Sequence, residues 1–181
     1  MPDPNLDQAI KEAYAVAPKG QVVIHTMELR HPDFRDDNGN PVAVRVVRAF
    51  KDLQARLEAD APMNPGEVVT FTALAFEFQE PELGTGPVPE MPVSMDNVGK
   101  TISDQLELAA VSQHKVEVTY RPYLSTQLDV GPKYNPPIHL VLTEVIVTPP
   151  RVSAKARMEN AADKAYPQDV YTVERFPGLG R

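Results

Sequence analysis

The sequence of 181 residues contains no cysteine. This absence excludes disulfides, thiolate zinc sites, iron–sulfur ligation and cysteine nucleophiles, and it favours a reducing compartment. A domain of this length buries roughly 70% of its unfolded surface, so its core needs neither a disulfide nor a metal. We therefore expect one domain that is held together by packing.

Basic charge is scarce as well. Lys and Arg number 18 against 25 Asp and Glu, which gives a net charge of −7. Binding to phosphates depends on Lys and Arg that displace counterions, so we expect no specific nucleic-acid binding. An acidic wall is still compatible with a lumen through which DNA slides.

Long apolar runs are missing too. The opening residues, MPDPNLDQAIKEAYA, lack the basic start and the apolar stretch of a signal peptide, and no run is long enough to span a bilayer. We expect a protein with no membrane anchor and no export signal of its own.

Proline, in contrast, is abundant. The chain has 19 prolines, which is about twice the usual share of roughly 5%. Proline is excluded from helix interiors and central strands, so these residues are expected in turns, edges and connecting loops. This composition favours a loop-rich β protein over a helix bundle.

Alternating apolar and polar residues predict most of the strands. They fall at 21–31, 42–50, 67–79, 93–98, 114–124, 138–147 and 151–160. Asn38-Gly39 predicts a hairpin turn, because both residues tolerate a positive φ. Residues 50–59 alternate strictly but consist of good helix formers, and we favour a strand there. The apolar face of 67–79 changes near Leu74 and Ala75, which indicates a bulge or bend.

Two segments have helical spacing. The first runs from Asn5 to Ala17 and is ended by Pro18 and Gly20, and the second covers Lys100 to Ala110. The predicted class is α+β, mainly β: an antiparallel sandwich or open barrel with an N-terminal and a middle helix. We expect a single domain over residues 1–164 and an extended C-terminal arm over 165–181.

No pattern of catalytic or metal-binding residues emerges. The four histidines show neither HxH nor HExxH spacing, DFRDDNGN lacks the register of a calcium loop, and no GxSxG surrounds a serine. The paired carboxylates lie in predicted turns, where acidic residues are simply solvated. We expect no enzymatic activity, no cofactor and no metal.

Contact chemistry in irregular segments is the distinctive feature. Tyr and Arg are enriched at protein interfaces, and a loop as long as Glu80–Pro92 usually contacts a neighbour or is functional. The alternative, that these aromatic side chains pack on their own domain, stays open. The candidate interface residues are Tyr120, Arg121, Tyr123, Pro87, Pro89, Tyr166, Tyr171, Arg175, Phe176 and Leu179.

Several ordered landmarks carry a family resemblance. They are AIKEAYAVAP, VVIHTMELRHPDF, LEADAP followed by GEVVTFTALAFEF, PVSMDNVGKTISDQLE, VTYRPYLSTQLD and the ending YPQDVYTVERFPGL. With them the chain resembles phage minor-tail (tail-tip) proteins, and it is more distantly similar to the N-terminal part of the lambda-type minor tail protein L. That protein continues into a cysteine-rich iron–sulfur segment, which has no counterpart here, so cluster binding is not implied.

The resemblance implies a non-enzymatic building block of a virion. It would form a ring at the tail tip or baseplate of a siphophage or prophage-derived particle, after synthesis in the host cytoplasm. The implied partners are further copies of itself, with a trimer favoured over a hexamer, the distal tail protein above and the central hub or fibre protein below. Two other functions are compatible with the sequence: a glycan-binding adhesin module, and a tail assembly factor absent from the mature virion.

Overall fold

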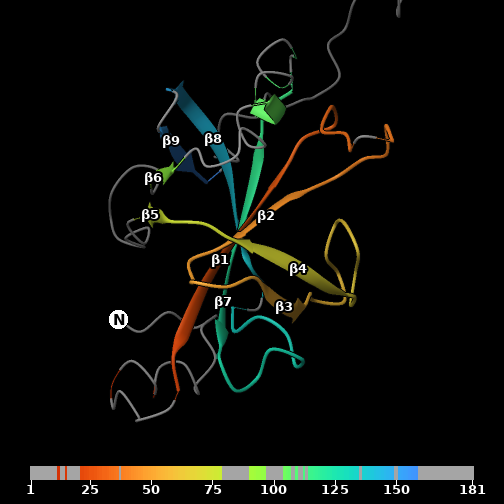
Figure 1. Cartoon of the computed structure of the whole chain (residues 1–181), viewed down its shortest axis with the longest axis vertical. Helices are drawn as coiled ribbons and strands as arrows, with labels where there is room; N and C mark the ends of the chain where they lie inside the picture. Colours follow the sequence, from red (N-terminus) through yellow and green to blue (C-terminus); the bar gives the residue numbers. More distant parts are fainter. Residues whose placement is uncertain are drawn as a thin grey trace, which may run out of the picture.

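The computed structural model describes residues 12, 15, 21–36, 38–78, 90–96, 104–106, 109, 112, 114–134, 136–148 and 151–158. Within these ranges the protein is mainly β (Figure 1). The strands are β1 (Val23–Arg30), β2 (Val44–Val47), β3 (Leu53–Arg56), β4 (Val68–Ala73), β5 (Phe76–Phe78), β6 (Glu90–Asp96), β7 (Glu117–Leu124), β8 (Ile138–Val147) and β9 (Arg151–Arg157).

These strands form one open sheet in the order β3-β4-β2-β1-β7-β8-β9-β6-β5. Neighbouring strands are antiparallel except β2 and β4, which run parallel through Val46↔Thr72 and Val47↔Ala73. The mainly-β class is confirmed, but the expected purely antiparallel arrangement is wrong. The chain reverses direction between β2 and β3 and again between β3 and β4, so β4 runs in the same direction as β2 and lies beside it.

β4 and β5 are two halves of one bent segment. Leu74 N donates to Val47 O on the β2 side of the bend, whereas Ala75 O accepts from Asp96 N at the end of β6. The bend predicted at these two residues is therefore confirmed, and the pairing partner changes there. Because β4 lies near one end of the strand order and β5 at the other, this segment requires the sheet to curl (Figure 1).

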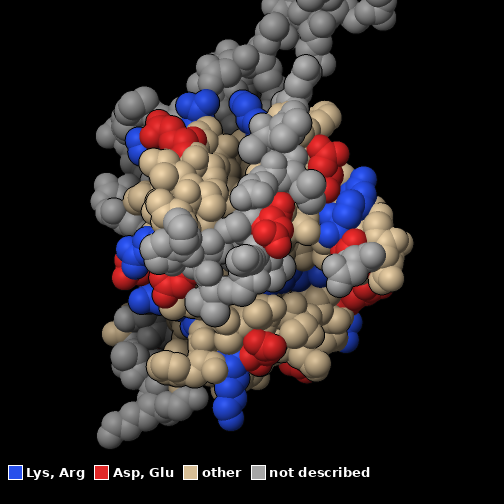
Figure 2. Space-filling view, turned by 45° about the horizontal axis from the view of Figure 1, so that its top comes forward, with Lys and Arg blue, Asp and Glu red and all other residues tan. Residues whose placement is uncertain are grey.

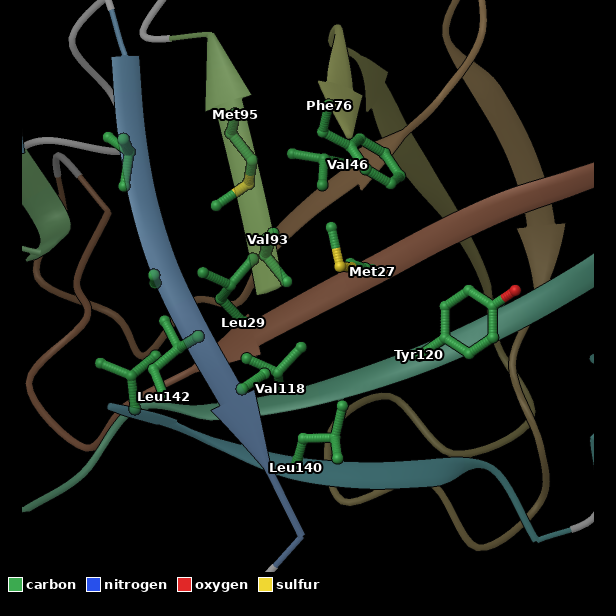
Figure 3. Close-up of a cluster of buried hydrophobic side chains, with 14 of the residues drawn as sticks. Met27, Leu29, Val46, Phe76, Val93, Met95, Val118, Tyr120, Leu140 and Leu142 are labelled. Carbon is green, nitrogen blue, oxygen red and sulfur yellow. The ribbon is translucent and has the colours of Figure 1, made fainter. Parts of the chain in front are cut away.

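The larger hydrophobic core lies inside the curl. Side chains from strands distant in the order, such as Met27, Val46, Phe76 and Met95, point toward one another (Figure 3). Each is at most 2% exposed, and burying a side chain of this kind contributes roughly 1.5–3 kcal/mol.

A second, smaller core lies on the opposite face of β2 and β7. Successive side chains of a strand point to opposite faces, so Val46 joins the first core while Val47 joins the second. The second core is completed by residues from β3, β4, β7 and the segment after β3: Ala55, Leu57, Ala61, Val69, Phe71 and Tyr123.

Two local predictions are confirmed. Gly39 has a φ of 82° in the turn before β2, and one oxygen of Asp36 accepts from the backbone N–H groups of Asn38 and Asn40 at 2.9 and 2.8 Å. The ambiguous stretch 50–59 contains β3, so alternation outweighed helix propensity there.

The expectation that proline avoids strands is wrong at two positions, Pro92 in β6 and Pro122 in β7. Each proline lies where its strand is no longer paired on one side. The pairing of β6 with β5 stops at Val93, next to Pro92, and the pairing of β7 with β8 stops at Tyr120, before Pro122. A missing N–H therefore leaves no gap in a ladder. The predicted loop Glu80–Pro92 is correspondingly shorter, because β6 begins at Glu90.

Both predicted helices fall mostly outside the described residues. Only Glu12 and Ala15 of the first, and residues 104–106 and 109 of the second, are described as helical, so the two helices stay predictions. The arm at 165–181 lies outside the described residues altogether.

Candidate functional site

The interface residues predicted on β7 are buried. Tyr120, Arg121 and Tyr123 are 1%, 0% and 0% exposed, which corrects their placement at an external interface. β7 lies between β1 and β8, so Tyr120 points into the larger core and the other two side chains point to the opposite face. The remaining candidates lie outside the described residues: Pro87, Pro89, Tyr166, Tyr171, Arg175, Phe176 and Leu179.

A buried charge cluster surrounds Arg121. Its guanidinium donates from Nε and Nη2 to the two carboxylate oxygens of Glu58 at 2.7 and 2.6 Å. Its third nitrogen, Nη1, lies 3.5 Å from Oε1 of Glu28, whose side chain is fully buried. Glu28 also accepts from Arg30 at 3.1 Å and from Arg45 at 2.7 Å. We call these five residues the charge cluster.

Strand register assembles this cluster. Glu28 in β1 stands directly opposite Arg45 in β2, and Arg30 stands opposite Glu117 in β7. Alternation gives Glu28 and Arg30 the same face of β1, so the charges of three strands converge. The alternation of polar and apolar residues over 21–31 indicated that one face of this strand is polar. It did not indicate which residues of the neighbouring strands lie opposite, because strand pairing cannot be read from the sequence.

Glu58 comes from the segment between β3 and β4 that covers this face. The same segment contributes Asn64, whose Oδ1 accepts from Nη2 of Arg45 at 2.9 Å, and Arg56 at its start donates to Gly66 O at 2.7 Å. The charge cluster therefore fastens residues 57–66 to the sheet. The charge cluster therefore has a structural role, because its charged groups form ion pairs and hydrogen bonds with one another.

The pKa values reflect this pairing. Burial raises the pKa of the Glu58 carboxyl, but the hydrogen bonds and charge of Arg121 outweigh it and hold the pKa below its ordinary value. Burial lowers the pKa of Arg121, yet Glu58 and Glu28 raise it above its ordinary value. Burial, followed by the charges of Arg30 and Arg121, lowers the pKa of His139.

We expect the Glu58 contribution to stability to disappear in acid. Because its folded-state pKa is lowered, the carboxylate stabilises the fold above its unfolded pKa of about 4.3, and this stabilisation is lost as the pH falls through the folded value. Urea unfolding between pH 7 and pH 3 should give a shallower decline for Glu58→Gln than for the parent protein. The exposed Glu77→Gln should keep the parental decline, and equal slopes for Glu58→Gln and the parent would contradict the prediction.

Two surfaces of the described residues expose apolar side chains. The first has the single fully exposed side chain of Phe50, at a pocket of about 410 Å³ that is also lined by charged residues, among them Arg48, Glu77, Asp96 and Arg151. The second lies at the end of β8, where Val145, Ile146 and Val147 are 38%, 62% and 41% exposed. Among the described residues, none lines the pockets at both places, so these are two different surfaces.

Charged residues of both signs are mixed on one face of the protein. On the face drawn in Figure 2, Lys and Arg alternate with Asp and Glu, and the described residues form no extended area of one sign. A pocket of about 290 Å³ beside the charge cluster is lined by Arg30, Glu117 and His139 together with Pro62, Leu140 and Val141. Arg30 and Glu117 bond to each other there at 3.0 Å.

Histidine side chains form hydrogen bonds within the protein. His31 accepts at Nδ1 from the backbone N–H of Asp33, and its Nε2 lies 3.1 Å from the carbonyl oxygen of His114, which places the ring proton on Nε2. His25 Nδ1 lies 2.8 Å from the hydroxyl of Tyr120. In the described part of the chain, no group of three or more His, Asp or Glu side chains is placed to hold a metal. No helix among the described residues has the length and apolarity to cross a membrane.

Comparison with known proteins gives a family match. A model of the family described as "Domain of unknown function (DUF1833)" matches residues 9–171. The matched span begins at Ala9, where the first sequence landmark begins, and ends inside the last one. No curated protein matches the chain.

Proposed function

The chain belongs to the DUF1833 family, a family without an assigned function, and we propose that it is a structural component of a siphophage or prophage-derived tail tip. In this proposal it forms a ring between the distal tail protein and the central hub or fibre protein. It acts by assembly, without catalysis, and resides in the virion. A trimer is favoured over a hexamer, and DNA passes the ring without specific binding.

The presence of two different surfaces with exposed apolar side chains carries the proposal. A ring closes through head-to-tail contacts, which need two distinct surfaces on each subunit. The surface at Phe50 and the surface at the end of β8 satisfy that need. The sequence landmarks support the same reading, because they run in one order over nearly the whole span that the family model matches.

The proposal also includes the parts of the chain outside the described residues. These are the N-terminal and middle helices within the single domain over residues 1–164, and the arm at 165–181. Pro87 and Pro89 in the long loop, and Tyr166, Tyr171, Arg175, Phe176 and Leu179 in the arm, are the proposed contacts with neighbouring subunits.

Deleting residues 165–181 should leave a folded monomer that no longer enters tail tips. In this proposal the arm binds a neighbouring subunit, so its loss should remove contacts between subunits while both described cores keep their residues. Circular dichroism tests folding, and mass spectrometry of purified particles tests incorporation. Fully assembled, infectious particles containing the truncated protein would contradict this role. Absence of the intact protein from particles would instead indicate an assembly factor.

The pocket at Phe50 favours a second candidate, a glycan-binding module. An exposed aromatic ring beside charged side chains, here Arg48, Glu77 and Asp96, is suited to stack on a sugar and to bind its hydroxyl groups. A glycan array with the purified protein separates the two functions. Binding that is lost in Phe50→Ala would support the adhesin.

A further inference from the structure

The end of β8 extends past its neighbour β7. β7 pairs with β8 only from Ile138 to Val141, and the next contact on that side is a hydrogen bond from Leu142 N to Val116 O. Over residues 143–147, no described residue pairs with β8 on the β7 side, whereas β9 continues along the other side. We call residues 143–147 the β8 edge.

The backbone of Val147, at the end of this edge, is directed away from β9. Thr148 and Arg151 exchange two N–H···O bonds at 2.8 and 3.1 Å, so they form a hydrogen-bonded pair at the end of the hairpin. Such pairs alternate with non-hydrogen-bonded pairs in an antiparallel ladder, and the N–H and C=O of Val147 therefore face away from β9. A bulge between Thr143 and Ile146, with Glu144 at a φ of 53°, separates this end from the rest of the strand.

An apolar groove runs beside the β8 edge. It has a volume of about 280 Å³ and is lined by Leu106, Ala109, His114, Lys115, Val116, Leu142, Val145 and Val147. Lys115 is exposed and gives the groove a basic rim, next to the exposed side chain of His114. Proteins normally cover or charge an open apolar strand edge, because it pairs readily with another chain. The edge and groove together suit an extended segment with apolar side chains and acidic ends.

The arm of this same protein contains such a segment. Residues 169–174, DVYTVE, place Val170, Tyr171, Thr172 and Val173, which all favour strands, between two acidic residues. Alternation puts Tyr171 and Val173 on one face, where both can enter an apolar groove. The acidic ends complement the basic rim in charge.

We propose that residues 169–174 of one copy add as a strand to the β8 edge of the neighbouring copy. Main-chain hydrogen bonds to Val147 supply affinity, and the groove selects the alternate side chains. The inference rests on the proposed ring, because it joins two different surfaces of successive subunits in a head-to-tail contact. It assigns the receiving surface that the arm requires.

Photocrosslinking of the full chain tests this contact. Tyr171→p-benzoylphenylalanine is placed in an unlabelled copy, which is mixed with a ¹⁵N-labelled parent copy before irradiation. We expect mass spectrometry to find the unlabelled arm joined to a labelled peptide that contains the β8 edge. An arm joined only to the β8 edge of its own unlabelled copy, or to another surface, would overturn the inference.

A point variant gives an independent measurement. Val147→Asp adds a negative charge beside the acidic segment, so we expect self-association to weaken about tenfold or more. The exposed Val130→Asp is the matched control and should leave it unchanged. Sedimentation velocity reports association, and thermal unfolding confirms that both variants fold. If the parent protein and Val147→Asp self-associate equally well, binding of the arm at the β8 edge is wrong, whereas the proposed ring is not contradicted. If the parent protein stays monomeric at every concentration, the proposed ring is wrong.

Discussion

Replacing Arg121 by methionine is expected to lower the free energy of unfolding by about 3–5 kcal/mol. The substitution keeps most of the side-chain volume but removes the cation that bonds both oxygens of Glu58 and lies beside Glu28. Two carboxylates then lose a partner inside the protein, and one of them, Glu28, is completely buried. Because desolvating an unpaired charge costs far more than an ion pair gains, breaking the pair has a large effect.

The same substitution at the surface provides the control. Arg151 lies 3.8 Å from Asp96, and both side chains are about half exposed, so Arg151→Met should change stability by only about 0–1 kcal/mol. Urea unfolding at pH 7 measures both variants. The double variant Glu58→Gln, Arg121→Met should lose less than the sum of its single changes, since the two residues form one interaction. Equal losses for Arg121→Met and Arg151→Met would show that the charge cluster does not stabilise the fold.

The strands were predictable because their cause is local. Alternation over residues 21–31, 114–124 and 138–147 reflects strands that divide their side chains between two faces, and each contains a strand in the structure. The turn at Asn38-Gly39 follows from local residue type as well, and it is Gly39 that takes the positive φ there. Residues 50–59 show the limit of propensity, since good helix formers are found in β3 when alternate side chains such as Ala55 have a core to enter.

The sheet order was not predictable, because its cause is not local. The sequence marks each strand but not its neighbour, and the parallel pairing of β2 with β4 depends on where β4 inserts. The same holds for the charge cluster. Glu28, Arg45 and Arg121 are ordinary alternating polar residues until register places them side by side.

The β7 interface prediction failed for an instructive reason. Tyr120, Arg121 and Tyr123 do have extensive contacts, as their residue types indicate, but these contacts lie within the chain. Tyr and Arg occur both at interfaces and inside proteins, because each combines a large buried surface with groups that form hydrogen bonds. Residue type therefore predicted that these side chains make contacts, but not whether the contacts are with their own domain or with another protein. The position of β7 in the middle of the sheet determines that they are with their own domain.

The second core gives the other prediction of large effect, a loss of about 3–5 kcal/mol in Phe71→Ala. Phe71 is 0% exposed, and its ring centroid lies 6.0 Å from that of Tyr123 in an edge-to-face arrangement. Removing the ring leaves a cavity between β4 and β7. The hydroxyl of Tyr123 donates to Arg56 O at 3.0 Å, so its position is fixed and the ring cannot easily move to fill the space.

Phe50→Ala is the matched control, because it removes an identical side chain from full exposure and should change stability by no more than about 0.5 kcal/mol. Hydrogen exchange locates the effect. Tyr123 belongs to the second core, and its strand β7 also contributes Tyr120 to the first. Faster exchange in Phe71→Ala should therefore extend into β1 and β7. Faster exchange confined to β3 and β4 would contradict this expectation and show that the second core opens separately from the first.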